Sequence, residues 1–73
     1  MSIEKDYQNL LGKISENIKR VRTEKGLTQE NMIKFGFNYR HYQRIESGDY
    51  SPNLFTLFRL AKAFKVPLTT FFD

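Results

Sequence analysis

Most of this chain divides into stretches whose apolar residues recur every three or four positions, and glycine or proline closes each stretch. The first stretch has its apolar positions at Ile3, Tyr7, Leu10, Leu11, Ile14, Ile18 and Val21. This spacing places them on one face of a helix. We expect Gly12 to bend or interrupt that helix. Lys25-Gly26 is expected to end it, with a cation in the last turn and glycine at C′.

Shorter helical patterns follow, each behind its own capping residue. The expected helices are Gln29 to about Phe35, Tyr39 to about Ser47, and one beginning at Leu54, capped by Thr28, Asn38 and Asn53. Gly36, Gly48 and Pro67 end them, and Leu68–Phe72 forms a short last turn. The inner face of the fourth helix is expected to carry Leu54, Leu57, Phe58, Ala61 and Phe64. No period-two strand pattern is found, so the sequence predicts an all-α protein of four or five helices.

The 73 residues predict a single small domain, 1–73. Without cysteine, neither disulfides nor thiolate metal sites can form, and one histidine makes a structural metal implausible, so we expect no metal and no cofactor. Stabilisation beyond a small core is therefore expected from self-association. The charged start is no signal peptide and no stretch could span a membrane, so we expect a cytoplasmic protein.

The charge balance favours an acidic partner such as nucleic acid. The formal net charge is +4, and from Asn17 onward basic residues outnumber acidic ones two to one. The alternative is a merely basic surface.

The two short helices joined by Gly36-Phe37-Asn38 form a candidate helix-turn-helix, at about residues 28–47. Tyr42 and Ile45 should point inward together. The remaining early positions of the second helix are Tyr39, Arg40, His41, Gln43 and Arg44. Arginine can bridge O6 and N7 of guanine, and glutamine can do the same for adenine. The alternatives are an ordinary helical hairpin and a solvated helix face.

Four blocks of sequence resemble the XRE family, the helix-turn-helix family of phage Cro and CI repressors and restriction–modification controller proteins. They are Lys25-Gly26-Leu27-Thr28-Gln29-Glu30, Ile45-Glu46-Ser47-Gly48, Pro52-Asn53-Leu54-Phe55-Thr56-Leu57 and Ala61-Lys62-Ala63-Phe64-Lys65-Val66. The resemblance covers roughly Ile18 to Phe72. It implies a compact five-helix bundle, lambda-repressor-like, here with an N-terminally extended first helix.

The resemblance also implies roles for individual residues. The residues expected to read bases are Tyr39, Arg40, Gln43 and Arg44. The residues expected to contact the DNA backbone are Gln29, His41, Ser51, Asn53 and Leu54. The last three lie at the start of a helix, which attracts anions. Two departures from the family pattern affect the register. Between Gln29 and Ile45 the chain is one residue shorter. The family often has a small alanine near Ile33, where the two helices cross, so a larger residue there is expected to alter the crossing angle.

Two further groups of residues have two interpretations each. Arg22 and Glu46 resemble a buried family ion pair that ties the first helix to the recognition helix; alternatively, both are exposed and unrelated. Phe55, Phe71 and Phe72 are expected to form a dimer interface; alternatively, they form a satellite core cluster. The helix before Asn17 is expected to cover or extend that patch.

The sequence therefore predicts a sequence-specific regulator, repressor or controller, that binds double-stranded DNA as a homodimer at a palindromic operator. The alternatives are an antitoxin-like protein-interaction module, the DNA-binding head of a longer regulator and, more distantly, an RNA-binding module. The serines lack a nucleophile elbow, His41 lacks a carboxylate partner and no glycine-rich loop could hold a nucleotide, so we expect neither an enzyme nor a small-molecule substrate.

Overall fold

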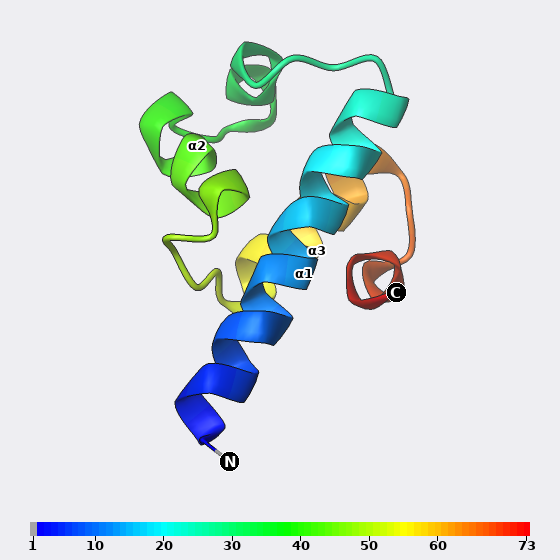
Figure 1. Ribbon diagram of the computed structural model, residues 1–73. Coiled ribbons are helices and arrows are strands. Elements are labelled where there is room, and N and C mark those ends of the chain that lie inside the picture. Colours follow the sequence, from blue (N-terminus) through cyan, green and yellow to red (C-terminus); the bar gives the residue numbers. More distant parts are fainter. Residues whose placement is uncertain (1) are drawn as a thin grey trace.

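A computed structural model describes residues 2–73, which contain three α-helices, two short 3₁₀ helices and no strand (Figure 1). In chain order the elements are α1 (Ile3–Glu24), η1 (Glu30–Phe35), α2 (Tyr39–Ser47), α3 (Leu54–Phe64) and η2 (Leu68–Phe72). The all-α prediction is confirmed. The prediction of five α-helices is wrong, because the second and the last segments are short 3₁₀ helices of six and five residues.

The segment of the motif that is expected to be one residue short contains a 3₁₀ helix, η1. Asn31 N–H bonds to the Thr28 carbonyl at 3.1 Å and Met32 N–H to the Gln29 carbonyl at 3.1 Å, which is i→i+3 pairing. A 3₁₀ helix rises about 2.0 Å per residue against 1.5 Å for an α-helix, so fewer residues span the same length. Thr28 Oγ1 also accepts from Asn31 N–H at 3.1 Å, as a helix cap does.

The capping residues act where the sequence predicts. Asn38 Oδ1 accepts from His41 N–H at 3.0 Å, and Asn53 Oδ1 accepts from Thr56 N–H at 2.8 Å. Gly26 closes α1 with φ +73, where Leu27 N–H reaches back to the Arg22 carbonyl at 3.1 Å. Gly12 does not interrupt the first helix, because α1 is continuous from Ile3 to Glu24.

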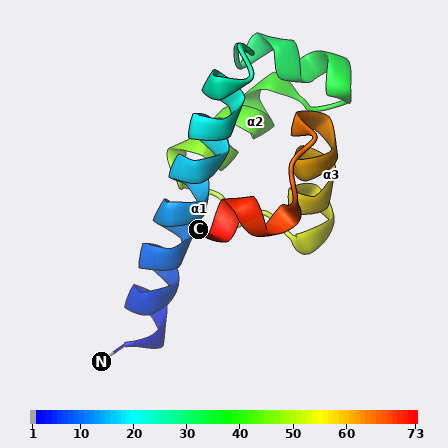
Figure 2. The ribbon, with the colours of Figure 1, turned by 90° about the vertical axis from the view of Figure 1, so that its right-hand side faces the viewer.

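The hydrophobic core lies between the second half of α1 and the inner faces of the other elements. Its members are Ile14, Ile18, Val21, Met32, Phe37, Tyr42, Ile45, Leu57, Leu60, Ala61, Phe64 and Phe71. η2 packs across both α1 and α3, so the C-terminal turn closes one side of this core (Figure 2).

Three expectations about apolar faces are wrong. Leu54 and Phe58 are 68% and 47% exposed, because the buried stripe of α3 passes instead through Leu57, Leu60 and Phe64. Phe71 is fully buried with its ring 6.3 Å from that of Phe64, so it is not available to a partner chain. For Phe71 the core-cluster interpretation is the correct one.

The first turns of α1 project away from this core. Residues 2–10, which we call the stalk, are all exposed, and the molecule measures 40 Å along its longest axis against 24 and 20 Å along the others. Figures 1 and 2 both show the stalk extending beyond the other elements.

Candidate nucleic-acid interface

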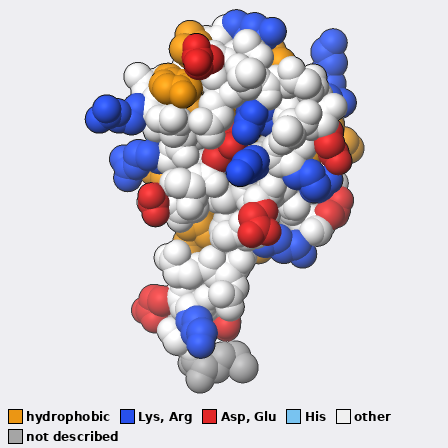
Figure 3. Space-filling model, turned by 45° about the horizontal axis from the view of Figure 1, so that its top comes forward, with side chains coloured by type: hydrophobic (Ala, Val, Ile, Leu, Met, Phe, Trp, Pro, Cys, Tyr) orange, Lys and Arg blue, Asp and Glu red, His pale blue; other side chains and the backbone are white. Residues whose placement is uncertain are grey.

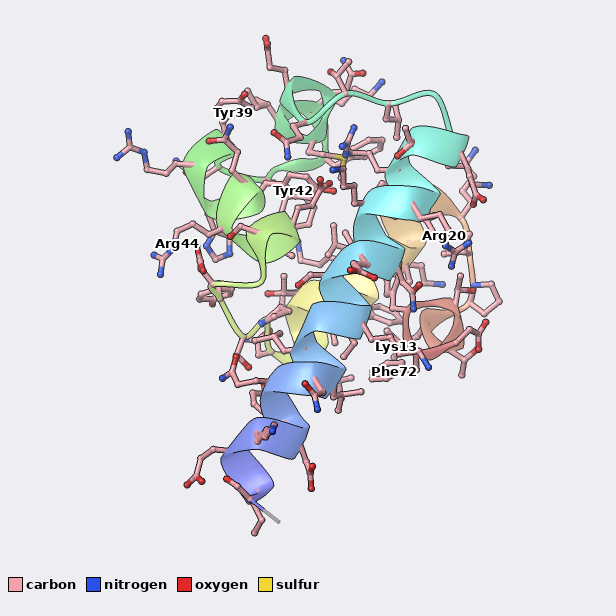
Figure 4. All side chains as sticks on the ribbon, in the orientation of Figure 1. Lys13, Arg20, Tyr39, Tyr42, Arg44 and Phe72 are labelled. Carbon is pink, nitrogen blue, oxygen red and sulfur yellow. The ribbon has the colours of Figure 1, made fainter. Side chains whose placement is uncertain are left out.

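α2 presents the side chains that the sequence assigns to base reading. Tyr42 and Ile45 are fully buried, whereas Tyr39, Arg40, Gln43 and Arg44 are exposed. Arg44 points away from the body while Tyr42 points toward α1 (Figure 4). The four exposed residues therefore lie on one continuous outer surface of α2, available to a ligand outside the fold.

The turn before α2 is held by a residue that sequence reasoning missed. The guanidinium carbon of Arg59, on α3, lies 4.2 Å from the centroid of the Phe37 ring, a cation–π distance. Arg59 Nη2 also donates to the Phe35 carbonyl at 3.4 Å. Gly36 has φ +90, and a Cβ there would come within 3.2 Å of Arg59 Nη2. The turn thus needs glycine for its backbone conformation, and a larger residue would also require the Arg59 side chain to shift slightly.

Phe37 also contacts α2, so it lies between Arg59 and that helix. Its ring meets the Tyr42 ring edge-on, with centroids 5.8 Å apart, and the Tyr42 hydroxyl donates to Glu46 Oε2. Arg59, Phe37, Tyr42 and Glu46 therefore form a contiguous series of contacts from α3 through the turn to α2.

Glu46 is the junction of a buried polar network. Arg22 donates from Nε to Glu46 Oε2 at 2.6 Å and from Nη2 to Oε1 at 3.1 Å, and its Nη1 reaches the Leu27 carbonyl at 2.7 Å. The two side chains are 10% and 3% exposed. Gln29 Nε2 adds a third donor residue, 3.1 Å from Glu46 Oε1. The structure thus brings Arg22 and Glu46 together and ties α1, η1 and α2 at one carboxylate.

The network shifts the pKa values of its members. Burial favours the neutral acid, but hydrogen bonds from Arg22, Tyr42 and Gln29 outweigh it and hold the pKa of Glu46 below its usual value. The bond to Glu46 raises the pKa of Arg22. Burial, followed by the bond to Glu46, raises the pKa of the Tyr42 hydroxyl well above its usual range. Glu46 and Arg22 are therefore ionised and Tyr42 is neutral at neutral pH.

Gln29 is placed between this network and the exposed surface of α2. It is half-buried, and Gln43 Nε2 lies 3.5 Å from Gln29 Oε1. Gln29, which is expected to contact a DNA phosphate, thus already donates a hydrogen bond to Glu46. Its side-chain carbonyl accepts from Gln43, which is expected to read bases.

Another missed residue, Tyr50, lies in the loop after α2. Its ring meets the His41 ring at 4.6 Å and lies 5.8 Å from the guanidinium carbon of Arg44. His41 is consequently half-buried rather than free at the surface. Tyr50 thus contacts two side chains of α2, that of His41 in the first turn and that of Arg44 in the second. No sequence pattern marks it, since one aromatic residue in a loop is not distinctive.

The second expected backbone clamp lies at the start of α3. Ser51, Asn53 and Leu54 are all exposed, with the Asn53 side chain occupied in capping Thr56. The hydroxyls of Ser51 and Tyr7 are hydrogen-bonded, which joins this loop to the stalk.

Basic side chains are spread over the body of the molecule, as the face in Figure 3 shows. Among the described residues no group of three or more His, Asp or Glu side chains is placed to hold a metal ion. None of the described helices is both long and apolar enough to cross a membrane.

The comparison with protein families agrees with this geometry. The helix-turn-helix family matches residues 18–71, which include the whole candidate interface and every core residue except Ile14. The chain belongs to the XRE family of DNA-binding helix-turn-helix proteins. It is also 39% identical over 62 residues to an uncharacterized HTH-type transcriptional regulator, y4dJ, of Sinorhizobium fredii, covering 84% of this chain and 77% of that protein. The stalk lies outside the family match.

Proposed function

We propose that this protein is a sequence-specific transcription regulator, of repressor or controller type, that binds a palindromic operator as a homodimer. The observation that carries the proposal is the outer surface of α2. Four donor or aromatic side chains without an acid among them lie there, on a helix whose opposite side is fully buried. A helix of this kind fits the major groove of B-DNA.

In this proposal the residues divide into two kinds of contact. Tyr39, Arg40, Gln43 and Arg44 read base edges. Backbone contacts from Gln29 and His41, and from Ser51, Asn53 and Leu54 at the start of α3, set the register without reading sequence. The long donors on α2 favour this assignment, as does the start of α3, where a helix dipole attracts phosphate.

The homodimer is proposed through the exposed aromatic side chains at α3 and η2. Phe55 is 68% exposed and Phe72 is 42% exposed, although both are large and apolar. Aromatic residues of this kind are enriched at protein–protein interfaces. Two copies related by a twofold axis would present two α2 helices to two operator half-sites.

Selection from a random pool of DNA duplexes tests the function. We expect a single motif with inverted symmetry, whose half-sites are separated by about one helical turn. The logarithm of the affinity should fall linearly with the logarithm of salt concentration, by about 0.9 per phosphate neutralised. No enrichment, together with binding that salt does not affect, would favour the antitoxin-like alternative. A monomeric protein with an asymmetric motif would favour the DNA-binding head of a longer regulator.

A further inference from the structure

The stalk is helical although none of its residues is buried against the rest of the fold. All nine residues from 2 to 10 are exposed, and Tyr7–Ser51 is the one side-chain hydrogen bond that joins the stalk to residues outside α1 in the part of the chain that the structure describes. The stalk is the first part of the 22-residue helix α1, and in proteins most helical stability comes from packing of an apolar face. A second surface would therefore be expected to cover part of this helix.

The stalk has an apolar stripe between two acids. Ile3, Tyr7 and Leu10 follow the i, i+4, i+7 spacing of one helix face, and they are 86%, 43% and 42% exposed. By helical geometry Glu4 and Asp6 lie on opposite sides of that stripe, and Lys5 lies on the back of the helix.

α3 carries a surface of matching character. Leu54, Phe55, Phe58 and Leu68 line a hollow with apolar walls, and Phe55 and Phe58 continue into a second hollow bordered by Arg59, Lys62 and Lys65. We call this continuous surface the Phe55–Phe58 groove. Lys62 Nζ lies 5.3 Å from the centroid of the Phe58 ring, which places a cation at the edge of the apolar floor.

The two surfaces agree in charge and in length. An apolar stripe with acids beside it matches an apolar floor with cations along its border. From Ile3 to Leu10 a helix rises roughly 10 Å, and from Phe55 to Lys62 it rises by the same amount. The stalk cannot fold back onto its own groove without breaking α1, which is one uninterrupted helix.

We propose that the Phe55–Phe58 groove binds the stalk of a second copy of this chain. The arrangement is reciprocal, so that each copy contributes one stalk and one groove to a twofold dimer. This inference rests on the proposed homodimer and names the segment that holds it together. It also accounts for a stalk that lies outside the family match.

Paired charge reversals test this contact in the full-length chain. A stalk variant carries Glu4→Lys and Asp6→Lys, and a border variant carries Lys62→Glu and Lys65→Glu. All four side chains are exposed, so both variants should keep the helical circular dichroism of the wild type. Sedimentation equilibrium should show the dimer dissociation constant of each variant raised about tenfold or more, because like charges then face each other.

Mixing the two variants provides the decisive comparison. In a reciprocal heterodimer one contact joins two reversed surfaces and the other joins two native surfaces, so both are complementary. Native mass spectrometry of the equimolar mixture should show heterodimers at concentrations where each variant alone is monomeric. Gln8→Lys with Asn9→Lys adds positive charge to the other side of the stalk and should leave the dimer intact.

Two outcomes overturn the proposal in distinguishable ways. If both variants dimerise as the wild type does, or if their mixture gives no heterodimer, the stalk does not occupy the groove, while the homodimer itself stands. If the wild type is monomeric at high micromolar concentration, both the stalk contact and the proposed homodimer fail. Selection of a DNA motif would still test DNA binding separately.

Discussion

The guanidinium of Arg22 lies against the carboxylate of Glu46 with both partners almost wholly buried, 2.6 Å from Nε to Oε2. These residues are 24 positions apart and join α1 to the C-terminal end of the helix that would read DNA. Tyr42 and Gln29 donate to the same carboxylate, so Glu46 accepts hydrogen bonds from three residues.

Arg22→Ala should lower the free energy of unfolding by roughly 3–5 kcal/mol, the usual cost of leaving a buried charge without its partner. Replacing both residues, Arg22→Met with Glu46→Leu, should cost less than the single change, since no charge is then stranded. Urea unfolding of the three proteins measures this. A near-neutral Arg22→Ala would mean that water solvates Glu46 in the folded protein.

The same carboxylate predicts how stability depends on pH. The pKa of Glu46 lies below its ordinary value of 4.5 in the folded protein. Its contribution is therefore fully present above about pH 4.5 and is lost as the pH falls through the lower folded value. In thermal melts between pH 6 and pH 3, the wild type should lose stability more steeply than the Arg22→Met/Glu46→Leu protein. Parallel curves would contradict this prediction.

Arg59 is predicted to position α2 through Phe37 rather than through charge alone. Arg59→Lys keeps the charge but loses the planar face that stacks on the ring, so amide hydrogen exchange in the turn from Gly36 to Asn38 should quicken in the free protein. Lys62→Met on the same helix removes an exposed cation and should leave that exchange unchanged. Equal protection in Arg59→Lys and the wild type would mean that the stack does not hold the turn.

Phe71 and Phe72 are neighbours with opposite surroundings. Phe71→Ala should destabilise the protein by about 3–5 kcal/mol, because it empties a fully enclosed site in the core. Phe72→Ala should change the stability of the monomer little and instead weaken self-association. Thermal melts together with sedimentation distinguish the two effects. Equal loss of monomer stability in both variants would contradict the distinction.

The sequence predicted local features well because short-range chemistry determines them. The caps at Asn38 and Asn53 and the stop at Gly26 depend on residues within one turn, so composition and spacing were sufficient. The outward side of α2 followed from the burial of Tyr42 and Ile45 in the same way.

Features that depend on distant packing could not be read from the sequence. Phe71 and Phe72 look alike in a short last turn, and only the position of η2 against α1 and α3 buries one of them. The stacking of Arg59 on Phe37 joins residues 22 positions apart and has no sequence signature.

The outer surface of α2 is proposed to read DNA bases, and Arg40→Ala tests this role most directly. Affinities are measured for the selected operator and for its single-base variants, with Arg20→Ala, an exposed arginine of α1, as the control. Arg40→Ala should abolish discrimination worth roughly 1–3 kcal/mol at one symmetric pair of operator positions while leaving preferences elsewhere intact. Arg20→Ala should leave every preference unchanged. If Arg40→Ala weakens binding to all duplexes by the same factor, Arg40 contacts the backbone and α2 does not read bases in the register proposed.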